Sequence, residues 1–364
     1  MATVPYLDQI VHGDALRVLG DLPRASVDLV FADPPYNLQL EGELWRPNLT
    51  RVDAVDEDWD QFADFAAYDE FTRAWLLAVR EVMKETATIW VSGTYHNIFR
   101  VGAIMQDLGF WMLNTVTWLK PNATPNFRGK RLKNDVEFII WAKRSEKTRY
   151  SFNHHLMKQF NGSKQLGCVW TIPICTGEER LRNAAGRKLH PTQKPEALLE
   201  RIILASSRVG DVVLDPFVGT GTTAAVAKRL RRHWIGIERE KRYVEAARRR
   251  VEAVQPLPPD DPLLAHHSRL GRVPIEELLR RGHLQAGQRL YLQGGEPEAV
   301  ILADGQVQVG DLVGTIHKVA ARLKGVPSCN GWILWYYEDG QTGDRYPLDV
   351  LRRRVRQAMQ EDAP

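Results

Sequence analysis

Four consecutive residues, Asp33 to Tyr36, carry the most suggestive chemistry in the chain. They read Asp-Pro-Pro-Tyr and directly follow the apolar run 27–32, which predicts a buried strand. Proline lacks a backbone N–H and pushes the residue before it toward an extended conformation, so Pro34 and Pro35 predict a stiff turn whose carbonyl groups lack partners. A carboxylate, a carbonyl and an aromatic ring suit a flat heterocycle with an amine, such as a nucleobase taken out of its stack. A strand end with a Pro-Pro turn and a buried tyrosine explains the four residues equally well.

A second apolar run, 212–214, ends in Asp215 and leads into a glycine loop that reads Pro-Phe-Val-Gly-Thr-Gly. An alanine-rich stretch that favours a helix follows the loop. Gly219 and Gly221 allow a ligand to approach the main chain closely, and the helix N-terminus behind them favours an anionic group. The next predicted strand ends in Glu238, which is placed to bind ribose hydroxyl groups.

The same loop leaves two other interpretations open. The spacing Gly219-x-Gly221-x-x-Ala224 also fits the dinucleotide fingerprint, so a nicotinamide-dependent enzyme is a rival from another class. An ordinary strand-helix-strand crossover, whose glycines only ease packing, is the purely structural alternative.

Together these segments resemble the DNA amino-methyltransferases that use S-adenosylmethionine, in the permuted order where the catalytic tetrapeptide precedes the cofactor loop. The resemblance implies that Asp33, Pro34, Pro35 and Tyr36 are catalytic. His190–Pro195 is similar to the segment that encloses the methionine part of the cofactor, and His12–Asp14 to the motif whose acid contacts its adenine. The implied cofactor is S-adenosyl-L-methionine, bound by Asp14, Asp33, His190, Thr192, Gln193, Lys194, Asp215, Pro216, Phe217, Gly219, Gly221, Thr222, Thr223 and Glu238.

Five further segments are similar to one subgroup, the cell-cycle-regulated adenine methyltransferases of alphaproteobacteria. They are Asn37–Leu40, Tyr95–Arg100, Trp170–Pro173, Thr176–Arg180 and Cys329–Trp332. This resemblance implies methylation of adenine N6 within GANTC in double-stranded DNA, without a partner restriction enzyme. A cytosine-N4 methyltransferase shares the fold but more usually carries serine in place of Asp33. A DNA-binding protein without catalysis has no need of both intact motifs.

The chemistry of methyl transfer gives the tetrapeptide definite tasks. An adenine amine is a poor nucleophile because its lone pair is delocalised into the ring. Hydrogen bonds from the amine to the Asp33 carboxylate and the Pro34 carbonyl favour a pyramidal nitrogen and stabilise its developing positive charge. Tyr36 is expected to stack on the base through its ring, so that its hydroxyl is dispensable. The reaction requires neither a metal ion nor a nucleophilic cysteine.

Six strand signals in the first part of the chain predict a mostly parallel, Rossmann-like α/β sheet with helices on both faces. They lie at 10–11, 27–32, 89–91, 138–141, 212–214 and 234–237. Ligands bind such sheets beyond the carboxyl ends of the strands, at a topological switch point. Four acids at predicted strand ends are therefore expected to converge on one crevice: Asp14, Asp33, Asp215 and Glu238.

The domain organisation follows from a change in composition. The regular pattern ends near Val254, and a proline-rich stretch interrupts it. We therefore expect a catalytic domain at 1–254, a linker at 255–273 and a small α+β module at 274–364. The module is predicted to contain a helix at 275–279, a hairpin with an Asp-Gly turn at 300–309, an aromatic strand at 332–337 and a basic amphipathic helix at 348–359. It resembles the small domain appended to some adenine methylases.

Candidate DNA contacts lie in two stretches without clear periodicity, 37–59 and 120–128, and in the C-terminal module. They are Arg46, Lys120, Asn122, Asn126, Arg128, Asn330, Trp332 and Arg352, which offer charge, amide groups and an aromatic ring. Plain surface loops explain the first two stretches equally well. On general grounds, Trp332 is more often a core residue than a base contact.

The composition agrees with this interpretation. The chain has 364 residues, of which 44% are hydrophobic, and this allows about two domains with a sizeable core. A formal net charge of +4 and a pI near 8.9 leave nucleic-acid binding open. Three scattered cysteines provide neither a disulfide framework nor metal-ligand spacing, which fits a reducing cytoplasm. We expect no membrane insertion, and both a monomer and a homodimer are compatible with the sequence.

Overall fold

The computed structural model describes residues 4–38, 60–125, 132–264, 273–340 and 342–361. Of the candidate DNA contacts, Arg46, Asn126 and Arg128 lie outside these residues. The chain divides into two compact units, Met1–His267 and Ser268–Pro364, and each is described by itself.

The first unit is built around a mixed sheet of eight strands in the described residues, in the order β1-β8-β7-β2-β3-β5-β4-β6. The strands are β1 (Gln9–His12), β2 (Val27–Ala32), β3 (Met83–Gly93), β4 (Trp111–Leu119), β5 (Val136–Lys143), β6 (Val169–Thr171), β7 (Val212–Asp215) and β8 (His233–Glu238). Neighbours from β1 through to β3 run parallel, whereas β5 is antiparallel to both β3 and β4. The predicted α/β class and mostly parallel sheet are therefore confirmed.

Two strands, β4 and β6, are not among those that the sequence predicts. In β4, buried residues alternate only in the second half of the strand, and β6 has only three residues at the edge of the sheet. Neither strand has the continuous apolar run of a covered central strand, so periodicity does not reveal it.

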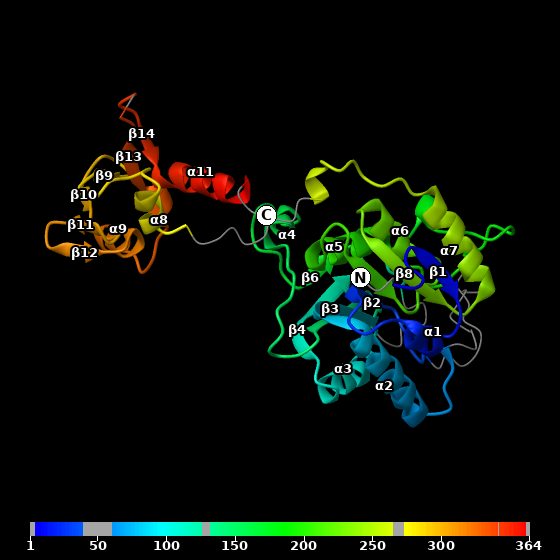
Figure 1. Cartoon of the computed structure of the whole chain (residues 1–364). Helices are drawn as coiled ribbons and strands as arrows, with labels where there is room; N and C mark the ends of the chain where they lie inside the picture. Colours follow the sequence, from blue (N-terminus) through cyan, green and yellow to red (C-terminus); the bar gives the residue numbers. More distant parts are fainter. Residues whose placement is uncertain (1–3, 39–59, 126–131, 265–272, 341, 362–364) are drawn as a thin grey trace. The chain divides into compact units, whose positions relative to one another are not determined.

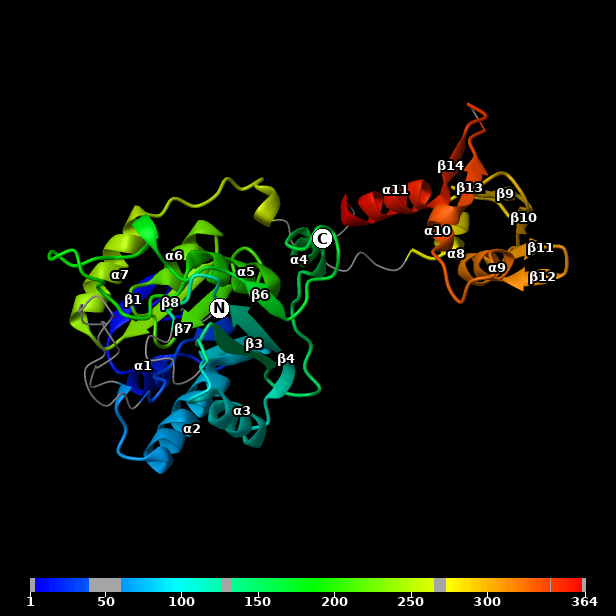
Figure 2. The ribbon, with the colours of Figure 1, turned by 180° about the vertical axis from the view of Figure 1, so that it is seen from behind.

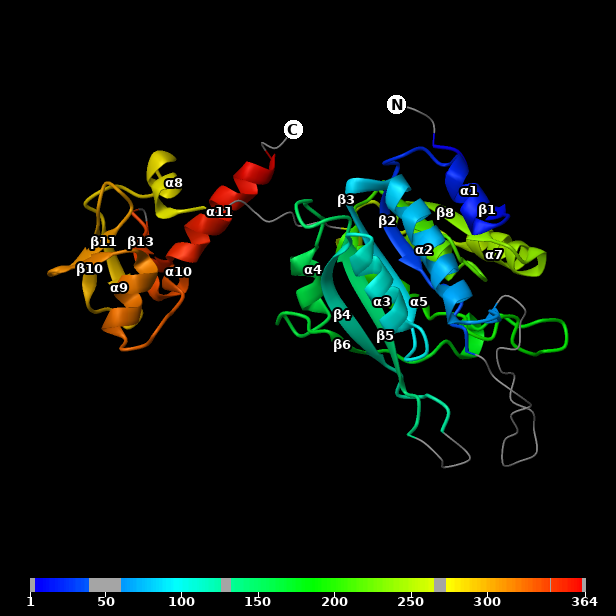
Figure 3. The same cartoon turned by 90° about the horizontal axis from the view of Figure 1, so that it is seen from below.

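Helices cover both faces of the sheet (Figure 1). One face packs against α1 (Ala15–Asp21), α2 (Phe65–Val82) and α3 (Ile98–Asp107), and Figure 3 shows α2 and α3 lying across the strands. The other packs against α4 (His154–Gln159), α5 (Glu196–Ser206), α6 (Thr222–Arg229) and α7 (Lys241–Ala253). Helices cover both faces of β2, and successive side chains of a strand point to opposite faces. Val30 and Ala32 therefore lie in one core cluster, and Leu29 and Phe31 lie in the other.

The proline-rich segment after α7 belongs largely to the first unit, and this differs from the predicted linker. The Leu257 N–H donates to the Arg229 carbonyl at 2.8 Å, and Arg231 Nε donates to the Leu257 carbonyl at 2.5 Å. Leu264, in the 3₁₀ turn Pro262–Leu264, is buried against the same core as α5 and α6. Leucines among the prolines pack this segment against the first unit. The first unit therefore ends at His267, and not at the predicted boundary Val254.

The second unit is an antiparallel sheet in the order β12-β11-β10-β9-β13-β14, with four helices in the described residues. Figure 2 shows this unit from behind. Its strands are β9 (Arg289–Leu292), β10 (Glu298–Ile301), β11 (Val307–Val309), β12 (Leu312–Gly314), β13 (Trp335–Glu338) and β14 (Arg345–Pro347). Its helices are α8 (Ile275–Arg280), α9 (Ile316–Leu323), α10 (Gly331–Leu334) and α11 (Leu348–Glu361). The β10–β11 hairpin and the helices α8 and α11 form where the sequence predicts them.

The aromatic strand of the second unit begins later than predicted, at Trp335. The Asn330 side chain accepts a hydrogen bond from the Trp332 N–H at 3.2 Å and begins the short helix α10. Because of this cap, residues 331–334 form a helix where the sequence predicts the start of the strand. None of the helices in the described part of the chain combines the length and apolarity that crossing a membrane requires.

Candidate active site

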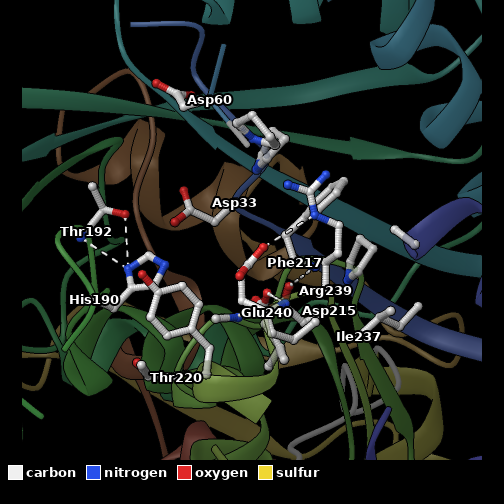
Figure 4. A pocket seen from close by; sticks show the side chains of 18 of the residues that line it. Asp33, Asp60, His190, Thr192, Asp215, Phe217, Thr220, Ile237, Arg239 and Glu240 are labelled. Carbon is white, nitrogen blue, oxygen red and sulfur yellow. Dashed lines mark hydrogen bonds and ion pairs between the residues drawn. The ribbon is translucent and has the colours of Figure 1, made fainter. Parts of the chain in front are cut away.

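A pocket of about 330 Å³ lies at the carboxyl ends of the parallel strands β1, β2, β7 and β8 (Figure 4). Asp14 and Asp33 follow the first two strands, and Asp215 and Glu238 end the other two. All four acids line this pocket, because parallel neighbours bring their carboxyl ends to one edge of the sheet. The expected convergence of these distant residues is therefore present.

Asp215 stabilises the glycine loop between β7 and α6 through two hydrogen bonds. Its Oδ1 accepts the Phe217 N–H at 2.9 Å, and its Oδ2 accepts the Thr223 hydroxyl at 2.6 Å. Burial raises the pKa of Asp215 to about 7, although both hydrogen bonds act in the opposite direction. The Phe217 ring packs edge-on against Trp75, with 5.5 Å between the ring centroids.

The two glycines of the loop meet different needs. Gly219 has a φ of +53°, and a Cβ there would lie 3.4 Å from His190 Nε2. Glycine therefore leaves the space between the main chain and the imidazole open. Gly221, with a φ of +83°, precedes α6, and a Cβ there would lie 2.9 Å from Ala247 Cβ on α7. The second glycine thus serves close packing of two helices.

Glu238 is held at the end of β8 by two backbone groups. Its Oε2 accepts the Gly219 N–H at 3.0 Å, and its Oε1 accepts the Glu240 N–H at 2.7 Å. Burial raises the pKa of Glu238. A carboxylate has about four lone-pair positions, so both oxygens can accept further hydrogen bonds from a ligand.

The segment 190–194 lines another part of the pocket. His190 Nδ1 accepts the Thr192 N–H at 3.2 Å, and its ring lies 4.6 Å from the Tyr243 ring. Burial lowers the pKa of His190 to about 3, so the imidazole is neutral. Gln193 is bonded within the protein: its Oε1 accepts the Leu181 N–H, and its Nε2 donates to the Glu179 carbonyl. Its amide therefore braces this loop.

A side chain absent from the sequence-based candidates, Asp60, holds the Asp33–Tyr36 turn. Its Oδ1 accepts the N–H groups of Tyr36 and Asn37 at 2.6 and 2.9 Å. Its Oδ2 accepts the Leu38 N–H at 3.0 Å. Nothing local in the sequence marks this residue, which is the last of an acidic run, because its partners lie more than twenty positions away.

The structure corrects one expectation about the turn's carbonyl groups. The Pro35 carbonyl accepts the Tyr68 hydroxyl at 3.0 Å, from helix α2, and is therefore not without a partner. The N–H of the following Tyr36 is bound to Asp60, so the backbone of the turn is held on two sides.

Tyr36 is largely buried, because only 7% of the residue is exposed. The hydroxyl donates to Asp33 Oδ1 at 2.6 Å and lies 2.9 Å from Ser92 Oγ. Burial, followed by the neighbouring carboxylates of Asp33 and Glu137, raises the pKa of Tyr36 well above its ordinary value. The hydroxyl therefore orients the Asp33 carboxylate, and this contact speaks against the expectation that the hydroxyl is dispensable for the reaction.

Two lysines and two carboxylates meet beside this turn. Lys194 Nζ donates to Asp33 Oδ2 at 2.5 Å and lies 3.8 Å from Glu137 Oε2. Lys120 Nζ donates to Glu137 Oε1 at 3.0 Å. Lys120, a predicted phosphate contact, is only 6% exposed, because it follows β4 directly and faces Glu137 on the neighbouring strand β5. No local sequence pattern marks Glu137.

The remaining described candidates are not among the residues that line the pocket. Asn122 Oδ1 accepts the Ile174 N–H at 2.9 Å. Trp332, with 6% exposure, is part of the core of the second unit, and the Arg352 guanidinium lies 4.8 Å from its ring centroid. Trp332 is therefore a packing residue, because α10 turns its ring inward. Among the described residues, no cluster of His, Cys, Asp or Glu is arranged to hold a metal ion.

The sheet order, the glycine loop and the acid-lined pocket define an α/β fold of the methyltransferase class. The chain matches the DNA methylase family over residues 27–249, and the Restriction Enzyme Adenine Methylase Associated family over residues 260–361. It therefore belongs to the DNA methylase family and is an S-adenosylmethionine-dependent DNA methyltransferase.

Two relatives each share 43% identity with the chain. The Type II methyltransferase M.HinfI of Haemophilus influenzae is similar over 331 residues, 91% of this chain and 92% of that protein. The Type II methyltransferase M2.DpnII of Streptococcus pneumoniae is similar over 258 residues, 70% of this chain and 94% of that protein.

Two solved structures are similar to the chain. The PvuII DNA methyltransferase, described as cytosine-N4-specific, has a TM-score of 0.52 and 22% identity, covering 66% of this chain and 85% of that one. The complex of M1.HpyAVI with its cofactor has a TM-score of 0.49 and 27% identity, covering 67% and 98%. The first likeness supports the fold alone.

The pocket fits S-adenosylmethionine by the chemistry of its lining. Carboxylates at Asp14 and Glu238 can accept hydrogen bonds from amine and hydroxyl groups, and those at Asp33 and Asp215 suit a positively charged sulfonium. The thin wall at Gly219, where a Cβ would meet the neighbouring imidazole, leaves room for a ligand beside the main chain.

Proposed function

We propose that this DNA methyltransferase methylates adenine N6 in double-stranded DNA, with GANTC as its target, and acts without a partner restriction enzyme. The observation that carries the proposal is that the Asp33–Tyr36 turn and the glycine loop line one pocket. A methyl donor and an acceptor amine can therefore meet there at near contact distance, as an in-line displacement requires.

The protein's part in the reaction is to position and activate the amine. When bound, S-adenosylmethionine supplies an electrophilic methyl group. Asp33 and the Pro34 carbonyl accept the two amine hydrogens, and Tyr36 offers its ring to the extruded base. Tyr36 also orients Asp33 through its hydroxyl, which donates to Oδ1. The proton of the methylated amine can leave after the transfer.

The cofactor is assigned to the pocket residues predicted from the sequence. Glu238 is proposed to bind the ribose hydroxyl groups and Asp14 the adenine. His190, Thr192 and Lys194 line the part assigned to the methionine end, with Asp215, Pro216, Phe217 and Gly219 forming the loop beside it. Gln193, Gly221, Thr222 and Thr223 support these groups mainly through internal contacts. No metal ion takes part in the proposed reaction.

The choice of adenine over cytosine is supported by the carboxylate at Asp33, where cytosine-N4 enzymes more usually carry serine. The GANTC target, and a place among the cell-cycle-regulated enzymes of alphaproteobacteria, are supported by the five sequence segments similar to that subgroup. Arg46, Asn122, Asn126, Arg128, Asn330 and Arg352 remain proposed DNA contacts. A cytoplasmic location and a homodimeric assembly also belong to the proposal.

A direct test combines the full chain, deuterium-labelled S-adenosylmethionine and two duplexes that differ only in whether GANTC is intact. Nucleoside mass spectrometry should detect labelled N6-methyladenine in the intact duplex alone, and Asp33→Ala should abolish it while S-adenosylhomocysteine binding changes by no more than about threefold. Labelled N4-methylcytosine would instead identify a cytosine enzyme. DNA binding without any labelled nucleoside would contradict the proposed catalysis.

A further inference from the structure

The Lys194 ammonium occupies a position that the proposed reaction needs for its target. It donates to Asp33 Oδ2 at 2.5 Å, and it lies 5.2 Å from the centroid of the Tyr36 ring. The target amine is assigned to the same carboxylate, and the target base to the same ring. The cation and the extruded base are therefore expected to bind the same two groups.

The charge of Lys194 also opposes the chemistry. Positive charge develops on the amine nitrogen during methyl transfer, and Asp33 is the group assigned to stabilise it. A second cation bound to the same carboxylate weakens that stabilisation, most of all in a site where little water screens the charges. Methyl transfer is therefore favoured once the ammonium has left Asp33.

Deprotonation of Lys194 is not the favoured way to release Asp33. Burial alone would lower the pKa of Lys194, but the carboxylates of Asp33 and Glu137 outweigh burial and hold this pKa above its usual range. Lys194 thus stays charged, and the ammonium needs another anionic partner when the base enters.

Glu137 is the nearest such partner. Its Oε2 lies 3.8 Å from Lys194 Nζ, while its Oε1 is held by Lys120 Nζ at 3.0 Å. The Lys194 backbone is fixed because its carbonyl accepts the Thr222 hydroxyl at 3.1 Å, whereas its stem has four flexible carbons. The ammonium can therefore swing between two carboxylates without a movement of the main chain.

We propose that Glu137 is a positioning residue for methyl transfer, because it takes up the Lys194 ammonium when the target base enters and so frees Asp33 for the amine. This inference rests on the proposed role of Asp33 as acceptor of the target amine. Lys120 keeps the Glu137 carboxylate in place and balances its charge. The two lysines and two carboxylates therefore stay paired whether Lys194 binds Asp33 or Glu137.

The test is a double-mutant cycle of Glu137→Gln and Lys194→Met in the full chain, measured by single-turnover methylation of a GANTC duplex. Glu137→Gln should lower the rate at least about tenfold while S-adenosylhomocysteine affinity changes less than about threefold. In the Lys194→Met background the same substitution should change the rate by less than about threefold, since no cation then needs a second partner. Glu137→Asp, which keeps the charge, should restore part of the lost rate.

Base capture supplies a second measurement that does not depend on turnover. A duplex with 2-aminopurine at the target position should gain less fluorescence with Glu137→Gln than with the parent protein, and this difference should disappear when Lys194 is replaced. Glu85→Gln is the matched control, because Glu85 is an exposed carboxylate paired with Arg144 at 2.7 Å. This variant should behave like the parent.

Two results would overturn the inference: a Glu137→Gln protein with the parental rate and capture, or an equal loss with and without Lys194. The second result would show that Glu137 acts only through the structure around Tyr36 or Lys120. A parent protein that methylates no adenine would refute the proposed function instead, so the two failures are distinguishable.

Discussion

A single hydroxyl links the aromatic ring of the catalytic turn to the carboxylate beside it. The Tyr36 O–H donates to Asp33 Oδ1 at 2.6 Å, while Lys194 occupies Oδ2. The orientation of Asp33 therefore depends on two side chains, one of them from a segment far along the chain. At this scale, hydrogen bonds and buried charges determine how the site behaves.

Tyr36→Phe is expected to lower the methylation rate roughly tenfold to hundredfold, because a hydrogen bond to a charged group contributes about 1.5–3 kcal/mol. Tyr36→Ala should cost more, since it also removes the ring. Single-turnover rates measure both effects. The control is Tyr6→Phe, because the Tyr6 hydroxyl also donates to a carboxylate, Asp21, but on the exposed surface. An unchanged rate in Tyr36→Phe would contradict the orienting role of the hydroxyl.

Asp215 is expected to make the protein without cofactor less stable as the pH rises. Burial raises its pKa from 3.8 to about 7 in the folded chain, so the folded state binds more protons than the unfolded state between these values. Its contribution to stability is therefore fully present below about pH 4 and is lost as the pH rises through about 7.

Asp215→Asn should flatten this pH dependence, because the amide does not ionise. Urea unfolding of the full chain at several pH values, with hydrogen exchange of the α6 amides, measures the effect. Glu85→Gln, at an exposed carboxylate, should leave the dependence unchanged. A parent protein whose α6 grows more stable from pH 5 to 7 would contradict the assignment of the shifted pKa to Asp215.

At the scale of helices and strands, the pocket depends on how closely α6 approaches α7. Gly221 has a φ of +83°, and an added Cβ would lie 2.9 Å from Ala247 Cβ. Gly210 has nearly the same φ, +82°, but an added Cβ there meets nothing within 4 Å. The two positions therefore separate the cost of the backbone conformation from the cost of the helix contact.

Alanine at either glycine should cost about 1–2 kcal/mol for the left-handed backbone conformation. Gly221→Ala should cost a further 1–3 kcal/mol or so, because two helices must move apart. It should also weaken S-adenosylhomocysteine binding, whereas Gly210→Ala should not. Urea unfolding and calorimetry measure the two effects. Equal losses in both variants would show that the contact with α7 has no energetic weight.

At the scale of the whole chain, the boundary between the units decides which truncation is stable. Leu264 is buried in the core of the first unit, so a protein ending at Asp261 lacks part of that core. A protein ending at His267 should unfold at a higher temperature than one ending at Asp261 and should bind S-adenosylhomocysteine like the full chain. Thermal unfolding and calorimetry compare them. Equal melting temperatures would contradict the packing role of Leu264.

The second unit is expected to supply phosphate contacts from the exposed side of α11. Arg353 and Arg354 are exposed, whereas Arg352 packs on Trp332. Replacing Arg353 and Arg354 by glutamine should lower the slope of log affinity against log salt by about two, if each contacts one phosphate. Arg280→Gln with Arg289→Gln is the control pair, at exposed positions of the same unit. Identical slopes for the two pairs would argue against α11 as a DNA contact.

Much of the fold follows from local sequence, and so does the meeting of the acids at the pocket. The runs 27–32, 212–215 and 234–237 are strands because they are continuously apolar, and such runs are buried on both faces of a parallel sheet. Since their carboxyl ends share an edge, the meeting of Asp33, Asp215 and the other acids is predictable from the sequence alone. Proline restricts backbone geometry and glycine widens it, so the Asp33–Tyr36 turn and the glycine loop are predictable as well.

Only the tertiary structure decided which partners these groups have. Antiparallel β5 lies between β3 and β4, and this brings Glu137 beside Tyr36 and Lys120. Asp60 and Lys194 contact the Asp33–Tyr36 turn from segments that share no local pattern with it. A short-range pattern records the conformation of its own residues, whereas the partner of a buried charge depends on which distant strands become neighbours. The sequence therefore determined which residue types gather at the pocket of this DNA methyltransferase, and the packing of its strands determined the charges that surround them.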